Sequence, residues 1–412
     1  MRKNVFLLIV SLALTFTACN KVKTDIENGQ FVLNTNTAAL QDRVSVVNEP
    51  LDFVTSTTKS TAVTYSLQNI WNVAPALTTQ SASSVAIDGT DVYVGFHVRG
   101  NTYNGEILKV SQSSTLTLAS WGLSSTLVDI NDLEYNASDN ALYIAGESDK
   151  RGAEALMINL ASSGVSNTPS TLGMPIFGAS GNSVTRITAG TNELLWVSAG
   201  GTQVSNSQGG LMELDLAATT PADPSTIKLA NEAKQFDSDG AYGLWIYGNG
   251  SYTFFNVFNA LTNTTKSLRQ AYTSTIINKP VTDYGKNAVD VKGTVGYVAM
   301  GAAGAYKIDL AGVPGATLAT YYDAANLGLA NGIATDGTYV YVAHGADGLI
   351  VLKASDMSEV GRWNGTTRSG TTEFNNGSCN YVAVGATTGT TTDLFVAFGT
   401  GGLMKLQFTV TP

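Results

Sequence analysis

Apolar residues occur in short runs separated by turns rich in glycine, from about residue 62 to the C-terminus. Short, turn-bounded runs of this kind are typical of β-strands. Within them an aromatic residue followed directly by a β-branched one recurs, with successive aromatic positions 44 to 54 residues apart. The pairs are Tyr93-Val94, Tyr143-Ile144, Trp196-Val197, Trp245-Ile246, Tyr297-Val298, Tyr341-Val342 and Phe395-Val396.

A period of this size in strand-forming segments predicts an all-β fold, a seven-bladed β-propeller of four-stranded antiparallel blades. The sixth repeat shows the pattern most cleanly, with strands expected over Ala330–Ala334, Tyr339–Ala343 and Leu349–Leu352. The Asp336-Gly337 pair between the first two strands is a strong hairpin signal. Both faces of a second strand are buried between neighbouring blades, so the recurring aromatic residues are expected in the core.

The last repeat lacks an outer strand, because only four residues follow Phe408. The segment Thr64–Val73 reads as a spare strand that could fill this position and close the ring. Such a closure would hide two open sheet edges. The alternative is that this segment only covers the side of the ring.

The N-terminus has the three parts of a signal peptide: Arg2 and Lys3, an apolar stretch over Val5–Leu14, and small residues before Cys19. The small residues resemble a bacterial lipobox, in which the cysteine is acylated and becomes the mature N-terminus. We therefore expect a signal peptide over 1–18, a lipidated Cys19 with a tether over 19–61, and the propeller over 62–412. The expected location is the bacterial outer membrane, at the cell surface or on the periplasmic face. Ordinary secretory cleavage beside an incidental cysteine is the alternative.

The stretch Val340–Leu352, with Tyr341-Val342 followed by Gly348-Leu349-Ile350-Val351, resembles the LVIVD-type repeat of bacterial cell-surface propellers. Gly304–Leu310 and Gly401–Leu406 are similar, and the match weakens toward the N-terminus, with the fourth repeat poorest. The resemblance implies an exported propeller lipoprotein with no common activity. It implies no catalytic residues.

The formal charge of −9 argues against nucleic acid and anionic lipid as partners. Contact with the membrane is expected through the lipid anchor only, and the chain is expected to be a monomer. Acylation of Cys19 would leave Cys379 as the one remaining cysteine, so no internal disulfide is expected. Cys379 lies in an apolar strand pattern and reads as a small buried hydrophobe.

Asparagine recurs where the chain enters the first strand of a repeat. These residues could form a ring of ligand-binding amides around the mouth of the central channel. Asparagine also caps turns through its own backbone, which is the alternative. The recurring residues are Asn131, Asn182, Asn287, Asn331 and Asn380.

The connections between second and third strands look longer in the first three repeats than in the last three. A raised wall beside a binding cleft would follow, with harmless loop variation as the alternative. Its candidate ligand-binding residues are His97, Arg99, Tyr103, Asp149 and Arg151.

No residue spacing resembles a metal motif, and we expect neither a catalytic residue nor a cofactor. Asp132 with Asn131 and Asn182 could nevertheless supply oxygen ligands for Ca²⁺ at the channel mouth.

The function expected from these features is that of a non-catalytic binding or interaction module for a glycan or an exported protein. A channel-mouth enzyme of the lactonase type is one alternative, because His97, His344, Asp132 and Asp290 are all expected near the channel. A scaffold for an outer-membrane complex is the other. Fold alone does not choose among these roles.

Overall fold

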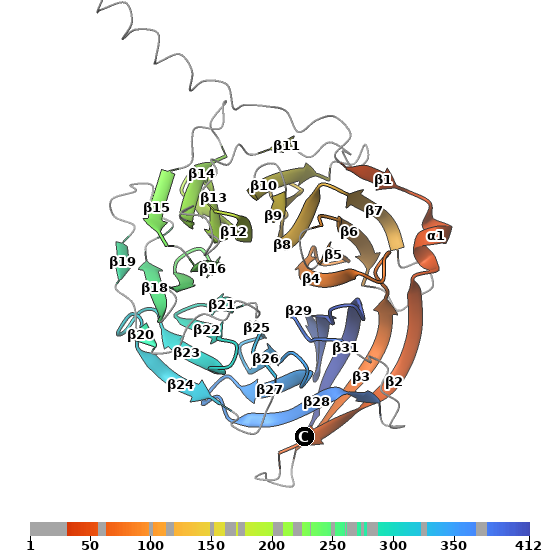
Figure 1. Cartoon of the computed structure of the whole chain (residues 1–412). Helices are drawn as coiled ribbons and strands as arrows, with labels where there is room; N and C mark the ends of the chain where they lie inside the picture. The colour runs from red at the N-terminus through yellow and green to blue at the C-terminus, as the bar shows by residue number, and fades with distance from the viewer. Residues whose placement is uncertain are drawn as a thin grey trace, which may run out of the picture.

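The described residues fold mostly into antiparallel β-strands arranged around a central opening, as in a β-propeller (Figure 1). The computed structural model describes residues 31–56, 63–98, 102–112, 119–148, 152–160, 170–171, 178–200, 209–216, 225–230, 232–248, 252–259, 261, 270–272, 276–277, 287–322, 328–367 and 377–412. Its one described helix is α1 (Thr37–Gln41). None of the described helices is long and apolar enough to cross a membrane.

Among the described residues, consecutive strands form groups of four, apart from the last group of three, and the first strand of each group lies nearest the central opening (Figure 1). The groups in the first half of the chain are β4 (Gln80–Ile87), β5 (Asp91–Val98), β6 (Gly105–Ser111) and β7 (Ala119–Ser125); β8 (Val128–Asn136), β9 (Ala141–Ser148), β10 (Gly152–Asn159) and β11 (Ser170–Thr171); and β12 (Ser180–Ala189), β13 (Asn192–Gly200), β14 (Gly210–Asp215) and β15 (Ser225–Leu229).

The groups of the second half follow the same order. They are β16 (Glu232–Ser238), β17 (Gly243–Gly248), β18 (Thr253–Asn259) and β19 (Gln270–Tyr272), with β20 (Ile276–Ile277) also on β18; β21 (Ala288–Lys292), β22 (Val295–Ala299), β23 (Ala305–Asp309) and β24 (Thr317–Tyr321); β25 (Gly332–Thr335), β26 (Tyr339–Ala343), β27 (Leu349–Lys353) and β28 (Glu359–Thr367); and β29 (Tyr381–Thr388), β30 (Thr391–Ala397) and β31 (Leu403–Thr411).

The N-terminal strands run along the outer edges of these groups. Strand β1 (Val32–Asn34) pairs with β7, and β2 (Val44–Thr55) lies between β28 and β3 (Thr64–Val73). The ordered fold therefore begins well before residue 62, and residues 31–56 are not the free tether expected from their lack of periodicity. Their strand pairing explains this difference, because β1 and β2 lie outside the core and most of their residues are exposed or half-buried, which leaves little apolar period.

An ion pair fixes this N-terminal segment to the β4–β7 group. The guanidinium of Arg43 donates from Nη1 and Nη2 to the two carboxylate oxygens of Glu106, at 2.6 and 2.9 Å, and from Nε to the carbonyl of Ala74 at 2.9 Å. The Glu106 side chain is 6% exposed and that of Arg43 is 14% exposed. A two-pronged arginine–carboxylate contact in this setting holds both groups in one geometry.

Strand β3 pairs antiparallel with β31 along its whole length, from Thr64 opposite Thr411 to Val73 opposite Leu403. Two glycines show that β3 takes the position of an outer strand beside β31. A Cβ on Gly402, before β31, would collide with the carbonyl oxygen of Val73 at the end of β3. A Cβ on Gly304, before β23, would collide in the same way with Tyr321 at the end of β24.

The recurring aromatic residues all lie in the second strands of their groups and are buried, as expected for a core position. Their polar atoms are also used, since the Tyr341 hydroxyl donates to Asp336 Oδ2 at 2.7 Å and the Tyr93 hydroxyl to Asp88 Oδ2 at 2.7 Å. Asp336 Oδ1 accepts the backbone N–H groups of Thr338 and Tyr339, so one aspartate ties the hairpin turn to the core. The strands and their aromatic residues are β5 with Tyr93, β9 with Tyr143, β13 with Trp196, β17 with Trp245, β22 with Tyr297, β26 with Tyr341 and β30 with Phe395.

Neighbouring groups pack through apolar clusters, and the last group packs against the first in the same way. Phe395 and Val73 share a buried cluster with Val94 and Phe96. A backbone bridge also recurs between a turn glycine of one group and the entry to the next. It joins Gly301 to Ala330, Gly345 to Cys379, and Gly399 to Ala82.

Candidate functional site

The structure describes some, but not all, of the residues predicted to bind a ligand or to carry the lipid. Cys19, Arg99, Asp149 and Arg151 lie outside the described residues. His97 is in β5, where it pairs with Ser81, and Tyr103 follows in the β5–β6 connection.

The β9–β10 connection is shorter than the raised wall requires. Glu147 pairs with Ala153 and Ser148 with Gly152, so only three residues separate the two strands. The two strands therefore extend into the segment Glu147–Glu154 that was expected to be a loop. The sequence did not show this, because the charged residues of the hairpin end resemble loop residues.

The asparagines at the strand entries link neighbouring groups. Asn131 Nδ2 donates to the carbonyl of Gly181 at 3.0 Å, and Asn182 Nδ2 donates to that of Ala233 at 2.7 Å. Each contact runs from one first strand to the next. The amide donors are thus occupied by backbone carbonyls, which gives these asparagines an assembly role.

The remaining asparagines follow this pattern in part. Asn331 Nδ2 donates to the carbonyl of Cys379 at 3.3 Å, and Asn380 Nδ2 lies 3.4 Å from Ser81 Oγ, which joins the last group to the first. Asn287 is buried, and its Nδ2 has no hydrogen-bond partner among the described residues. Ligand binding by this set stays a prediction.

Carboxylates on the first strands make a second set of links. Asp132 Oδ2 accepts the N–H of Val184 at 3.1 Å, and Asp290 Oδ2 accepts that of Thr335 at 2.6 Å. Glu134 and Asp237 accept the N–H groups of Arg186 and Val291. The inner edge of a sheet has N–H groups without a strand partner, and these side chains satisfy them.

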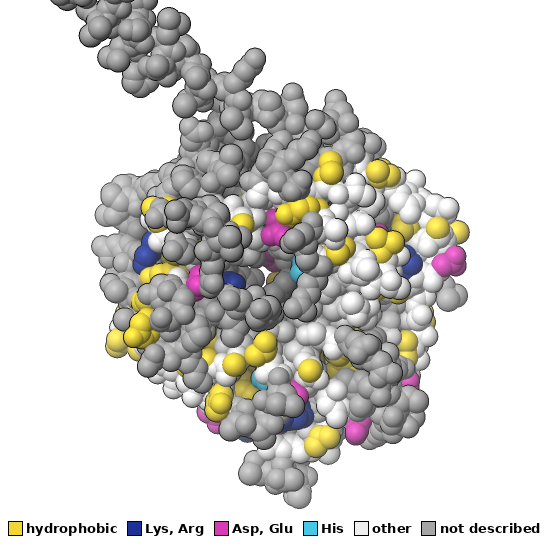
Figure 2. All heavy atoms as spheres, viewed as in Figure 1, with side chains coloured by type: hydrophobic (Ala, Val, Ile, Leu, Met, Phe, Trp, Pro, Cys, Tyr) yellow, Lys and Arg dark blue, Asp and Glu magenta, His cyan; other side chains and the backbone are white. Residues whose placement is uncertain are grey.

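These carboxylates lie close enough to perturb one another. Burial raises the pKa of Asp237 to about 6 and raises the pKa values of Glu134 and Asp290 well above their usual range. The charge of Asp237 contributes to the rise for both of the other two. Burial raises the pKa of Tyr381, and all four carboxylates, Asp132 included, add to this. These side chains come from four groups, and all lie on first strands, which are nearest the central opening (Figure 1). Figure 2 shows the viewed face hollowed at its centre, with acidic and histidine side chains nearby.

The expected Ca²⁺ ligands are engaged with protein donors. His97 Nδ1 lies 3.4 Å from Asn131 Oδ1, and the Ser180 hydroxyl donates to Asn182 Oδ1 at 3.3 Å. Across the part of the chain that the structure describes, no three His, Cys, Asp or Glu side chains gather closely enough to hold a metal ion. Calcium binding stays a prediction.

His344 and Cys379 are both buried beside the mouth. His344 Nδ1 lies 3.3 Å from Asp347 Oδ2, which also accepts the N–H of Gly328. Burial raises the pKa of the Cys379 thiol. A buried, protonated thiol is a poor nucleophile, so Cys379 acts as the small apolar residue that its sequence context predicted.

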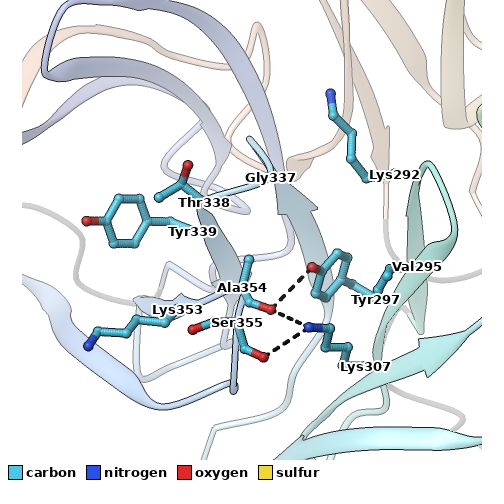
Figure 3. Close-up of a pocket in the computed structure, with 10 residues that line it drawn as sticks. All are labelled: Lys292, Val295, Tyr297, Lys307, Gly337, Thr338, Tyr339, Lys353, Ala354 and Ser355. Atoms are coloured by element: carbon cyan, nitrogen blue, oxygen red, sulfur yellow. Dashed lines mark hydrogen bonds between the residues drawn. The ribbon is translucent and has the colours of Figure 1, made fainter.

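A pocket of about 570 Å³ lies between the β21–β24 and β25–β28 groups (Figure 3). It is on the face opposite the predicted mouth, because it is built where first strands end rather than where they begin. Lys292 ends β21, Lys353 ends β27, and Thr338 precedes β26. The other described lining residues are Val295, Tyr297, Lys307, Gly337, Tyr339, Ala354 and Ser355.

The three lysines of the pocket have different roles. Lys307 reaches across it and donates to the carbonyls of Ala354 and Ser355 at 2.8 and 3.0 Å, so it holds the two groups together. Lys292 and Lys353 extend toward opposite ends of the pocket (Figure 3), and neither ammonium group makes a hydrogen bond or ion pair with a described residue. The described lining contains no carboxylate. The pocket is therefore locally cationic in a chain of net charge −9.

Comparison with known proteins adds a fold and no activity. No family model matches the chain, and no curated protein matches it. Among solved structures, the crystal structure of Chaetomium thermophilum Raptor is similar, with a TM-score of 0.52 and 12% identity over 81% of this chain. This chain covers 28% of that one. A likeness at this identity reflects the fold alone.

Sequence reasoning missed the lysine pocket altogether. Its lysines are 46 residues apart between Lys307 and Lys353, which is close to the repeat length, and both stand in third strands. That spacing indicates that Lys307 and Lys353 occupy similar positions in neighbouring repeats. Lys292 has no counterpart at this spacing, so its approach to the other two depended on the three-dimensional fold.

Proposed function

We propose that this protein is an exported, lipid-anchored β-propeller of seven blades that acts as a non-catalytic binding module for a glycan or an exported protein. The seven-bladed count is supported by the aromatic position, which recurs in the second strand of every group of strands. Closure by β3 is supported by two glycines. A Cβ on Gly402 would collide with β3, just as a Cβ on Gly304 would collide with the outer strand β24. Closure is supported also by the Gly399–Ala82 bridge, which matches those between consecutive groups.

The observation that carries the binding role is the lysine pocket between two groups. Ammonium groups, tyrosine rings and turn hydroxyls are suited to holding a polar ligand, and a volume of about 570 Å³ is in the range of small-molecule sites. By contrast, the channel amides and carboxylates hold the groups together. We therefore expect ligand recognition at the perimeter rather than at the channel mouth.

The lipid anchor rests on Cys19 and the segment before it, and the resemblance to LVIVD-type repeat propellers agrees with export. Two or more acyl chains would anchor the protein almost permanently, at about 0.8 kcal/mol for each buried CH₂ group. We expect Cys19→Ala to move the protein from the membrane to the soluble fraction. Retention of the variant in membranes would contradict the anchor.

The binding role is tested by a thermal-shift screen of the detergent-extracted full chain against oligosaccharides, lactones and divalent metals. A ligand that binds only the native state raises its apparent stability by mass action. A shift with saccharides supports the proposal. Turnover of a lactone by the same preparation would instead support the enzyme alternative.

A scaffold role is a second candidate, favoured by apolar residues exposed at the outer edge of one group. Leu318 in β24 is 52% exposed, and Val313 and Tyr322 on either side of that strand are 68% and 59% exposed. An exposed apolar edge is typical of a protein-binding surface. Capture of one envelope protein by the native chain, lost in Leu318→Lys, would favour this role.

A further inference from the structure

The lysine pocket has a charge pattern that selects among ligands. Lys292 is exposed, and its side chain stands at one end of the pocket. Lys353 is half-buried at the other end. The carboxylates that interact electrostatically with them, Asp290 with Lys292 and Asp356 with Lys353, are not lining residues. A ligand in this pocket therefore meets cationic groups first.

The middle of the pocket is crossed by contacts between the two groups. Lys307 is fixed by two backbone carbonyls, and the Tyr297 hydroxyl lies 3.5 Å from one of them, that of Ala354. Tyr339 packs edge-on against Phe408, with ring centroids 5.3 Å apart. These contacts leave Lys292 and Lys353 as the lining lysines whose ammonium groups are available to a ligand.

We infer that this pocket binds an acidic oligosaccharide, with one carboxylate or sulfate group held by Lys292 and another by Lys353. The inference rests on the proposed binding role and names its ligand class. Lysine is a compact charge on a flexible stem, so it can follow an oxyanion without a fixed approach direction. The hydroxyls of Thr338 and Ser355 are suited to neighbouring sugar hydroxyls, since each can donate and accept.

Binding is measured by calorimetry on the detergent-extracted full chain. The ligands are a uronic-acid oligosaccharide, a sulfated oligosaccharide, a neutral oligosaccharide of equal length, and inorganic sulfate. We expect one or both acidic sugars to bind at least about tenfold more tightly than the neutral one. We also expect the acidic affinity to fall as salt is added, because exposed charges are screened. Binding of inorganic sulfate as tightly as the acidic sugars would reduce the site to one for a free anion and would overturn the sugar assignment.

The variants Lys292→Gln and Lys353→Gln are each expected to lower the acidic affinity about tenfold or more, because a hydrogen bond to a charged group is lost. Lys109→Gln is the matched control. It removes the same charge from β6, where Lys109 pairs with Asp91 at 2.7 Å, and should change the affinity less than about twofold. Thermal unfolding of all three variants checks that the fold persists.

Two outcomes separate this inference from the binding role beneath it. If the neutral sugar binds as tightly as the acidic ones, or if both pocket variants bind like the parent, the binding role stands and the acidic-sugar site is wrong. If no saccharide of either kind binds, the glycan part of the proposed function fails together with the inference.

Discussion

The strand-entry asparagines offer the sharpest test of whether the channel mouth is a binding site or part of the frame. Asn182 and Asn331 each donate to a backbone carbonyl of the next group, at 2.7 and 3.3 Å. Replacing either with alanine removes the hydrogen bond and leaves its carbonyl partner without that donor. Neither substitution touches the lysine pocket.

The expected cost follows from burial. A typical hydrogen bond contributes about 1 kcal/mol net, and a buried polar group left without a partner costs about 1–3 kcal/mol. Asn182 is half-buried, so Asn182→Ala should cost about 1 kcal/mol, whereas Asn331 is 5% exposed and Asn331→Ala should cost about 2 kcal/mol. The two residues share no partner, so the double variant should lose about 3 kcal/mol.

Guanidinium unfolding of the single and double variants measures these losses. We expect the denaturant concentration at the midpoint to fall while the m-value, the dependence of the unfolding free energy on denaturant, stays constant. This result indicates lost stability without a change in compactness. Ligand affinity should not change. Variants with parental stability that no longer bind the ligand would refute the assembly role and return these amides to the binding site.

Two further predictions concern charged groups. Arg43→Ala should lower the free energy of unfolding by about 2–4 kcal/mol, because it leaves the Glu106 carboxylate buried without its partner. Adding Glu106→Gln should restore part of this loss. Unfolding midpoints equal to that of the parent in every variant would contradict the prediction. The raised pKa of Asp237 means that the folded protein loses stability between about pH 4 and its pKa of about 6 as the carboxyl ionises. Asp237→Asn keeps an oxygen acceptor for Val291, so it should match the parent below about pH 4 and exceed it by about 1–2 kcal/mol at pH 7; an equal difference at both pH values would exclude this cause.

The strand pattern was predictable because each repeat carries its own local signal. The Asp336-Gly337 turn and the aromatic residue five positions after Asp336 predict a hairpin in the sixth repeat, and Tyr339–Ala343 is a strand as expected. The segment Thr64–Val73 was also predicted as a strand with the bounds that it has in the structure. Counting strands in the last repeat was enough to suggest its partner.

The site was less predictable because it depends on which side chains meet between groups. The sequence suggested that Asn182 faces a ligand, but its partner Ala233 is 51 residues away and offers only a backbone carbonyl. Every residue has a backbone carbonyl, so residue types do not indicate which carbonyl accepts a side-chain hydrogen bond. The same reason hid the role of Lys307, whose partners are also carbonyls, and with it the pocket that Lys307 crosses.

The pairing of β3 with β31 has a consequence for how the chain folds. The two strands come from opposite ends of the sequence, so their contact is among the least local in the molecule and should form slowly. During synthesis β3 is made early and cannot pair with β31 until β31 has been synthesised. Trp71 and Leu67, buried in the finished fold, would meanwhile remain exposed to aggregation. A truncation within β31 should therefore unfold the beginning of the chain, and not only its end.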